Sequence, residues 1–169
     1  KQMVDWAIGH EVDAVVMAGD LIDQDNRYFE AIGPLQAGFD RLSSKGIAVY
    51  LVTGNHDFNV LAEIVSNKQY ENIHILGADG SWEKKTHRGE QTTVQFTGWS
   101  FPNKYVRKDP LASFDGLRLD PNIPTIGILH SEADNPDSRY GPVELDRLRS
   151  AGPDVWILGH IHKPTTLNK

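Results

Sequence analysis

Short, continuous apolar runs alternate along the chain with longer segments whose apolar residues have helical spacing. In residues 1–10 the apolar side chains recur at helical intervals, which predicts a helix. A longer helix is expected from about residue 26 to residue 44, because its apolar residues form one stripe and Gly46 follows as a stop signal. Gly33-Pro34 in its middle should kink or divide this helix.

Four of the apolar runs read as buried strands that lead into loops. They alternate with helical segments, and strands that are apolar throughout imply a sheet covered on both faces by helices. The strands are expected at 13–20, 47–54, 125–130 and 154–160, and further helices at about 60–68 and 142–152.

Residues 73–99 have a different character, because β-forming residues flank a polar turn near Gly89. This pattern predicts a β-hairpin. The basic residues near its tip are expected to be exposed to solvent in the turn, without a specific function. These residues are Lys84, Lys85, His87 and Arg88.

The four predicted strands all end on polar residues that can bind metal ions. The carboxyl ends of strands are where open α/β sheets bind ligands, so residues spread over about 140 positions can converge there. Taken singly, Gly-Asp is usually a turn and a lone histidine is usually hydrogen-bonded, but their joint occurrence favours a metal site. The candidate ligands are Asp20, Asn55, His130, His160 and His162.

These candidates form a donor set of one carboxylate, one amide oxygen and three imidazoles, without sulfur. Such a set suits Mn, Fe, Zn or a similar divalent ion rather than calcium. A carboxylate can bridge two cations, which makes Asp20 the natural shared ligand. His160 and His162 could serve two different ions about 3.5–4 Å apart.

Composition narrows the setting of such a site. The formal net charge of the 169 residues is -6, which disfavours strong nonspecific binding to the DNA backbone, although bound cations can make a cleft locally positive. The absence of cysteine excludes disulfides and thiolate ligands and fits a reducing compartment, so the expected location is cytoplasmic. No apolar run approaches the roughly 18 residues of a membrane span, and no signal-peptide pattern is present.

The motifs Gly-Asp, Gly-Asn-His-Asp, a lone histidine after an apolar strand and Gly-His-Ile-His, in this order, resemble those of the calcineurin-like metallophosphoesterases. The resemblance covers residues 13–164. It implies an α/β fold in which two mixed β-sheets flanked by helices form a four-layer sandwich around two divalent metal ions, Mn above all and otherwise Fe, Zn or Ni. Within the family, VTGNHD, FTGWSFPN and LGHIHKP are most similar to the SbcD-type DNA-repair exonucleases.

Carried over by position, the resemblance makes Asp20 the bridging ligand and gives Asn55, His130 and His160 to one metal together with it. His162 would belong to the other metal. The family pattern begins with an Asp-x-His pair on an earlier strand, and this sequence contains no Asp-x-His. We therefore expect residues 1–169 to be one partial domain, truncated at the N-terminus and at the C-terminus, with one metal site complete and the other incomplete.

The resemblance also assigns the two residues that follow Asn55. His56 would lie outside the coordination shell, face the scissile phosphate and protonate the leaving oxygen. Asp57 would hold its imidazole and favour the imidazolium form.

The leading functional prediction is a metal-dependent phosphodiesterase that acts on DNA as an SbcD-type exonuclease or endonuclease. The net charge of -6 favours an alternative, a hydrolase of small phosphodiesters such as cyclic nucleotides or nucleotide-sugar lipids. A third reading is a phosphoesterase fold with a degenerate metal site that serves as a protein-binding scaffold. Resemblance to the SbcD branch further implies a homodimer and an ATPase partner.

Overall fold

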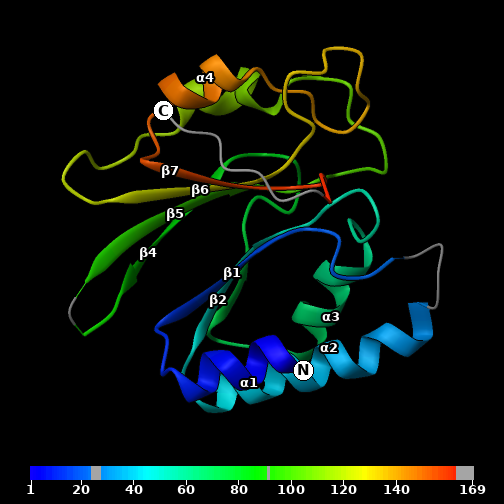
Figure 1. The fold of residues 1–169 in the computed structure, drawn as a ribbon, viewed down its shortest axis with the longest axis vertical. Helices are drawn as coiled ribbons and strands as arrows, with labels where there is room; N and C mark the ends of the chain where they lie inside the picture. The colour runs from blue at the N-terminus through cyan, green and yellow to red at the C-terminus, as the bar shows by residue number, and fades with distance from the viewer. Residues whose placement is uncertain (24–27, 91, 163–169) are drawn as a thin grey trace.

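The computed structural model describes residues 1–23, 28–90 and 92–162. Two β-sheets pack face to face in it, with helices on their outer faces (Figure 1). The first sheet is parallel, in the order β1-β2-β3, and the second is mixed, because β4 and β5 are antiparallel while β5, β6 and β7 run parallel. The strands are β1 (Ala14–Ala18), β2 (Ala48–Val52), β3 (Ile73–Ile75), β4 (Glu83–Arg88), β5 (Thr93–Trp99), β6 (Thr125–His130) and β7 (Val155–Gly159).

This arrangement agrees with the sandwich implied by the resemblance and corrects the single sheet expected from the apolar pattern. In the described ranges, each sheet packs against helices on one face and against the second sheet on the other. Among the described strands, the first sheet is parallel rather than mixed.

The helices lie on opposite outer faces of the sandwich, with α1 and α2 below the first sheet and α4 above the second in Figure 1. None of the helices in the described ranges is both long and apolar enough to cross a membrane. The short 3₁₀ helix η1 was not expected from the sequence. The helices are α1 (Gln2–Gly9), α2 (Tyr28–Ser44), α3 (Val60–Lys68), η1 (Pro110–Gly116) and α4 (Leu145–Ser150).

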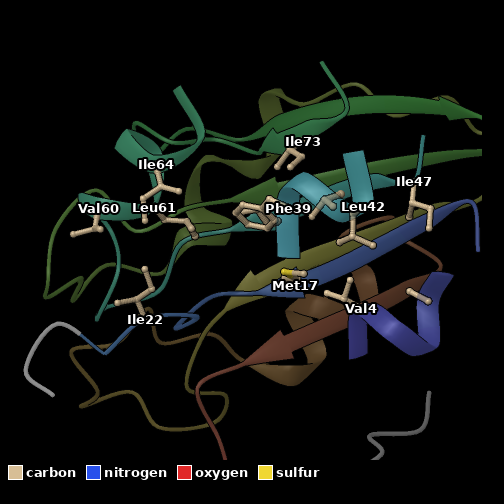
Figure 2. Packing of buried hydrophobic residues seen from close by; sticks show 13 residues of the cluster. Val4, Met17, Ile22, Phe39, Leu42, Ile47, Val60, Leu61, Ile64 and Ile73 are labelled. Carbon is tan, nitrogen blue, oxygen red and sulfur yellow. The ribbon is translucent and has the colours of Figure 1, made fainter. Parts of the chain in front are cut away.

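Helix α2 continues through Pro34, so of the two effects predicted for Gly33-Pro34, a kink or a division, the division is wrong. A proline removes one backbone hydrogen bond. The packing of the apolar stripe outweighs this loss, because Phe39 and Leu42 are each only 1% exposed in the cluster between α2 and the first sheet. Figure 2 shows both side chains in this cluster together with Met17 of β1.

Strand β2 is apolar at every position because both of its faces are buried. Val49 and Leu51 pack toward the helices, whereas Ala48, Tyr50 and Val52 pack between the sheets. Successive side chains of a strand point to opposite faces, so a strand between a helix layer and a second sheet must be apolar on both.

The β4–β5 hairpin is confirmed, with Arg88 opposite Thr93. The expectation that His87 is solvated at the tip is wrong, because its ring points between the sheets. Its Nδ1 lies 3.2 Å from the hydroxyl oxygen of Tyr50. Lys84 Nζ donates a hydrogen bond to the backbone carbonyl of Arg118.

Candidate metal centre

Three strand ends bring Asp20, His130 and His160 together. Asp20 lies in the loop after β1, His130 ends β6, and His160 follows β7. One ligand atom from each lies within 4.8 Å of the others. Because β1 belongs to the first sheet and β6 and β7 to the second, this metal-ligand cluster joins the two sheets where the carboxyl ends of their strands meet.

The ring of His130 is oriented by a backbone carbonyl. Its Nδ1 lies 2.8 Å from the carbonyl oxygen of Ala18, which can only accept a hydrogen bond, so Nδ1 carries the proton. In a neutral ring Nε2 then has a free lone pair. Metal-bound histidines are usually held in this way, because the hydrogen bond fixes both the tautomer and the ring orientation.

Two oxygens face that same Nε2 atom. Oδ1 of the buried Asn55 lies 3.1 Å away and Oδ2 of Asp20 lies 3.2 Å away. A second proton on the ring or a bound cation at Nε2 would satisfy both oxygens. The donor set of carboxylate, amide and imidazole fits a divalent transition ion. Asn55 lies beside the cluster, and its role as a metal ligand stays a prediction.

Electrostatics favour the ligand-competent forms of Asp20 and His160. Burial alone would raise the pKa of Asp20, but the hydrogen bond and charge of His130 and the backbone N–H of His56, 2.9 Å from Asp20 Oδ1, hold that pKa below its ordinary value. Burial lowers the pKa of His160, and the nearby His130 lowers it further. A carboxylate and a neutral imidazole are the protonation states that bind metals.

Glycines around the ring of His130 make the close approach of the strand ends possible. A Cβ atom on Gly19 or on Gly159 would lie only 2.7 Å or 2.8 Å from His130 Nδ1. A Cβ atom on Gly54 would lie 2.8 Å from Cε1 of the same ring. These three glycines directly precede the candidate ligands Asp20, Asn55 and His160. Besides allowing a turn, each of them leaves space for the ring of the fourth candidate, His130.

Two members of the cluster have left-handed backbone conformations. Asp20 has φ of 53° and His160 has φ of 90°. Residues other than glycine rarely adopt such backbone angles, which cost about 1–3 kcal/mol of conformational free energy each. Residues strained in this way cluster at functional sites. The strain is consistent with a cluster maintained for chemistry rather than for stability.

The imidazole of His56 lies beside a carboxylate that the sequence did not single out. His56 Nδ1 is 3.1 Å from Asp23 Oδ1, and the His56 side chain is 34% exposed. Asp23 follows Asp20 by three residues in the same loop, a spacing that could have pointed to it.

Asp57 has a different role from the predicted one. It is fully buried, its Oδ1 accepts the backbone N–H of Gly54 at 2.7 Å, and its Oδ2 accepts that of Leu21 at 2.7 Å. Burial raises the pKa of Asp57, and the two N–H groups oppose this shift. Asp57 therefore fastens the loop after β1 to the loop after β2, while Asp23 takes the place beside the His56 ring.

His162 is not part of the cluster. It lies beyond β7 and is exposed, whereas His160 two residues earlier is half-buried. The assignment of His162 to a second metal ion stays a prediction.

The stretch FTGWSFPN joins the two sheets beside the cluster. The hydroxyl of the buried Ser100 accepts the backbone N–H of Thr53 at 3.0 Å and donates to the carbonyl of Leu76 at 2.7 Å. The ring of Phe101 meets that of His130 edge-on, with centroids 5.4 Å apart. These residues of the stretch therefore support the site by packing.

Comparison with known proteins finds similarity of three kinds, to a family model, to a curated protein and to solved structures. Residues 1–164 match the family model described as calcineurin-like phosphoesterase. A curated relative, the "Uncharacterized metallophosphoesterase YhaO" of Bacillus subtilis (strain 168), is 33% identical over 174 residues, which are 99% of this chain and 41% of the relative. The chain thus spans less than half of that relative's length. A solved crystal structure with 14% identity aligns with a TM-score of 0.61 over 98% of this chain and 80% of its own, which supports the fold alone.

Proposed function

This chain belongs to the calcineurin-like phosphoesterase family, and from that premise we propose that it is a metal-dependent phosphodiesterase whose substrate is DNA, as in SbcD-type nucleases. The observation that carries the proposal is the metal-ligand cluster, in which Asp20, Asn55 and His160 lie around His130 Nε2. Family membership supports hydrolysis of phosphoric esters. The choice of a DNA phosphodiester rests on the resemblance to the SbcD branch.

Four residues would hold the cation as ligands, namely Asp20, Asn55, His130 and His160. A divalent ion bound there supplies Lewis-acid chemistry, since it neutralises phosphate oxygens and lowers the pKa of water. The protein contributes fixed ligands: the Ala18 carbonyl sets the ring of His130, and the His56 N–H sets the carboxylate of Asp20. This preorganisation reduces the rearrangement that binding would otherwise require.

His56 is the proposed proton donor to the leaving oxygen. Its backbone N–H donates to the carboxylate of Asp20, so the residue lies beside a proposed ligand, and its side chain is 34% exposed and accessible to a substrate. Asp23, 3.1 Å from Nδ1, would orient the ring so that Nε2 faces the substrate. A positioned acid of this kind is worth about 10²–10⁴-fold in rate.

The test is a comparison of substrates with the complete protein, stripped of metal with a chelator and reloaded with Mn²⁺. We expect Mn²⁺-dependent cleavage of labelled single- or double-stranded DNA, and none by the Asp20→Ala variant. Hydrolysis of cyclic nucleotides without cleavage of DNA would replace the proposal with a small-molecule phosphodiesterase. No hydrolysis of either, by protein that holds metal, would indicate a binding scaffold.

A further inference from the structure

A series of neighbouring aromatic side chains leads from the metal-ligand cluster to the protein surface. The ring of Tyr140 packs on that of His160, with centroids 4.7 Å apart and planes at 35°. Tyr105 follows, 6.0 Å from Tyr140. The guanidinium carbon of Arg139 lies 4.8 Å from the Tyr105 centroid and 6.0 Å from that of Tyr140. We call Tyr105, Arg139 and Tyr140 the aromatic platform.

Backbone hydrogen bonds hold the two loops of the aromatic platform together. Val106 pairs with Tyr140 in an isolated parallel bridge. The N–H of Val106 donates to the Arg139 carbonyl at 2.8 Å, and the N–H of Gly141 donates to the Val106 carbonyl at 2.9 Å. The rings are thus positioned before any ligand arrives, which limits the entropy lost on binding.

Tyr105 is unusual in its exposure. It is 48% exposed, although a tyrosine normally buries most of its ring area. Its neighbour Arg139 is also exposed, and an arginine stacked on a tyrosine offers a flat, cationic surface. Such a surface beside a phosphoesterase cluster suits a substrate that has both an aromatic ring and a negative charge.

A groove of ≈ 410 Å³ continues from Tyr105 away from the cluster. Its wall contains the apolar residues Trp99 and Pro102 and the exposed cations Arg107 and Lys108. The acidic residue in this wall, Asp109, is already engaged, because one oxygen accepts the N–H of Leu111 and the other pairs with Arg147. The groove therefore combines apolar surface with unbalanced positive charge.

We propose that the aromatic platform and this groove bind a single-stranded polynucleotide, with the base next to the scissile phosphate stacked on Tyr105 and the following phosphates near Arg107 and Lys108. This inference rests on the proposed function and deepens it, because it specifies unpaired bases as the feature that is recognised. Stacking platforms beside a positive groove are how proteins bind single strands without reading sequence. In a duplex the base faces are already stacked on one another and are not available to Tyr105.

The first test measures binding without catalysis, by fluorescence anisotropy of a labelled single-stranded oligonucleotide with the metal-free complete protein. Tyr105→Ala should raise the Kd about 10-fold, since stacking contributes about 1–3 kcal/mol per base. Tyr105→Phe keeps the ring and should bind like the wild type. Trp6→Ala is the matched control, because Trp6 is an exposed aromatic residue on α1 and lies outside the platform. Equal Kd values for Tyr105→Ala and Trp6→Ala would overturn the platform.

The second test uses the Mn²⁺-loaded protein and two single-stranded substrates, one with normal bases and one with an abasic residue beside the cleaved phosphate. Tyr105→Ala should raise KM for the first substrate and leave kcat unchanged, and it should have no effect on the abasic one. Wild-type protein that cleaves both with the same KM would overturn the platform while the proposed function stands. If the wild type cleaves no DNA, the proposed function fails, and the anisotropy arm still decides whether Tyr105 stacks on bases.

Arg139→Gln provides a second variant, because the side chain is exposed and its loss does not threaten the fold. We expect weaker binding of the oligonucleotide and a smaller dependence of the Kd on salt, since one cation fewer contacts the strand. An unchanged salt dependence of the Kd would show that Arg139 does not contact the bound strand.

Discussion

Two pairs of histidines lie in this fold, and their surroundings differ in kind. At the strand ends, His130 and His160 have ring centroids 5.2 Å apart and share their site with the carboxylate of Asp20. Between the sheets, His74 and His87 flank the ring of Tyr50, with centroids 5.2 Å and 5.8 Å from it. His130 is buried and the other three are half-buried, so burial alone does not distinguish the two pairs.

The atoms that face the ring nitrogens do distinguish the two pairs. Nε2 of His130 meets two oxygens, from Asp20 and Asn55, whereas Nδ1 of His87 meets the hydroxyl of Tyr50. Burial lowers the pKa of His74, and the nearby positive charge of Lys85, which would also repel a cation, lowers it further. A pair of histidines can bind a metal ion when oxygen ligands face its ring nitrogens. Without such oxygens, the pair only contributes to packing.

The sharpest test of this difference is to replace one side chain at each of the two sites. Asp20→Ala should weaken divalent metal binding by at least about 100-fold, since even the partners that orient metal ligands contribute about 10–100-fold. His87→Ala should keep the metal content of the wild type. Metal content after dialysis, measured by mass spectrometry on folded protein, is the readout. Equal loss in both variants would show that the comparison is wrong.

The next largest effect separates catalysis from metal binding within the strand-end site. His56→Ala should lower kcat by about 10²–10⁴-fold, the usual contribution of a positioned acid, and leave the metal content intact. Asp23→Asn should have a smaller effect in the same direction and alter the pH profile of kcat, because Asp23 acts through His56. Loss of metal in His56→Ala would make His56 a ligand instead.

The strand-end residues could be predicted because their patterns are local. An apolar run followed by a polar residue marks a strand end. Parallel pairing of β6 and β7 brings His130 and His160 to one edge of the second sheet, and the packing of the two sheets places Asp20 beside them. Asp23 was missed because it lies in a loop without periodicity. Asp57 was misassigned because its adjacency to His56 in sequence suggested contact with the ring, while the backbone turns its carboxylate toward Gly54 and Leu21.

The division into two sheets could not be read from the apolar pattern. A strand buried between a helix layer and a second sheet has the same apolar sequence as a strand between two helix layers, as β2 illustrates. The pairing of Tyr105 with Arg139 was equally inaccessible, because an isolated bridge joins loops that are distant in sequence. Such contacts depend on tertiary packing rather than on local preference.

The glycines offer a weaker test of how tightly the strand-end site is packed. Gly54→Ala should destabilise the fold by about 1–3 kcal/mol, because the added methyl overlaps the carboxylate of Asp20 and the ring of His130. Gly9→Ala is the matched control, since no atom lies within 4 Å of its Cβ position at the end of α1, and it should be neutral or stabilise by up to about 1 kcal/mol. Urea unfolding measures both, and similar destabilisation by the two variants would contradict the packing argument.

The smallest expected effect concerns the histidines between the sheets. Burial lowers the pKa of His74 below its ordinary value of 6.5, and the charge of Lys85 lowers it further. The unfolded chain therefore binds a proton at His74 more readily than the folded chain, so this residue costs no stability above pH 6.5 and increasingly destabilises the fold as the pH falls below that value. Urea midpoints measured at pH 5 and pH 7 should differ less in His74→Gln than in the wild type, and Lys85→Gln should lie between them. The same pH dependence in all three proteins would mean that His74 is as free to ionise as in the unfolded chain, and that this pair is less enclosed than the pair at the strand ends.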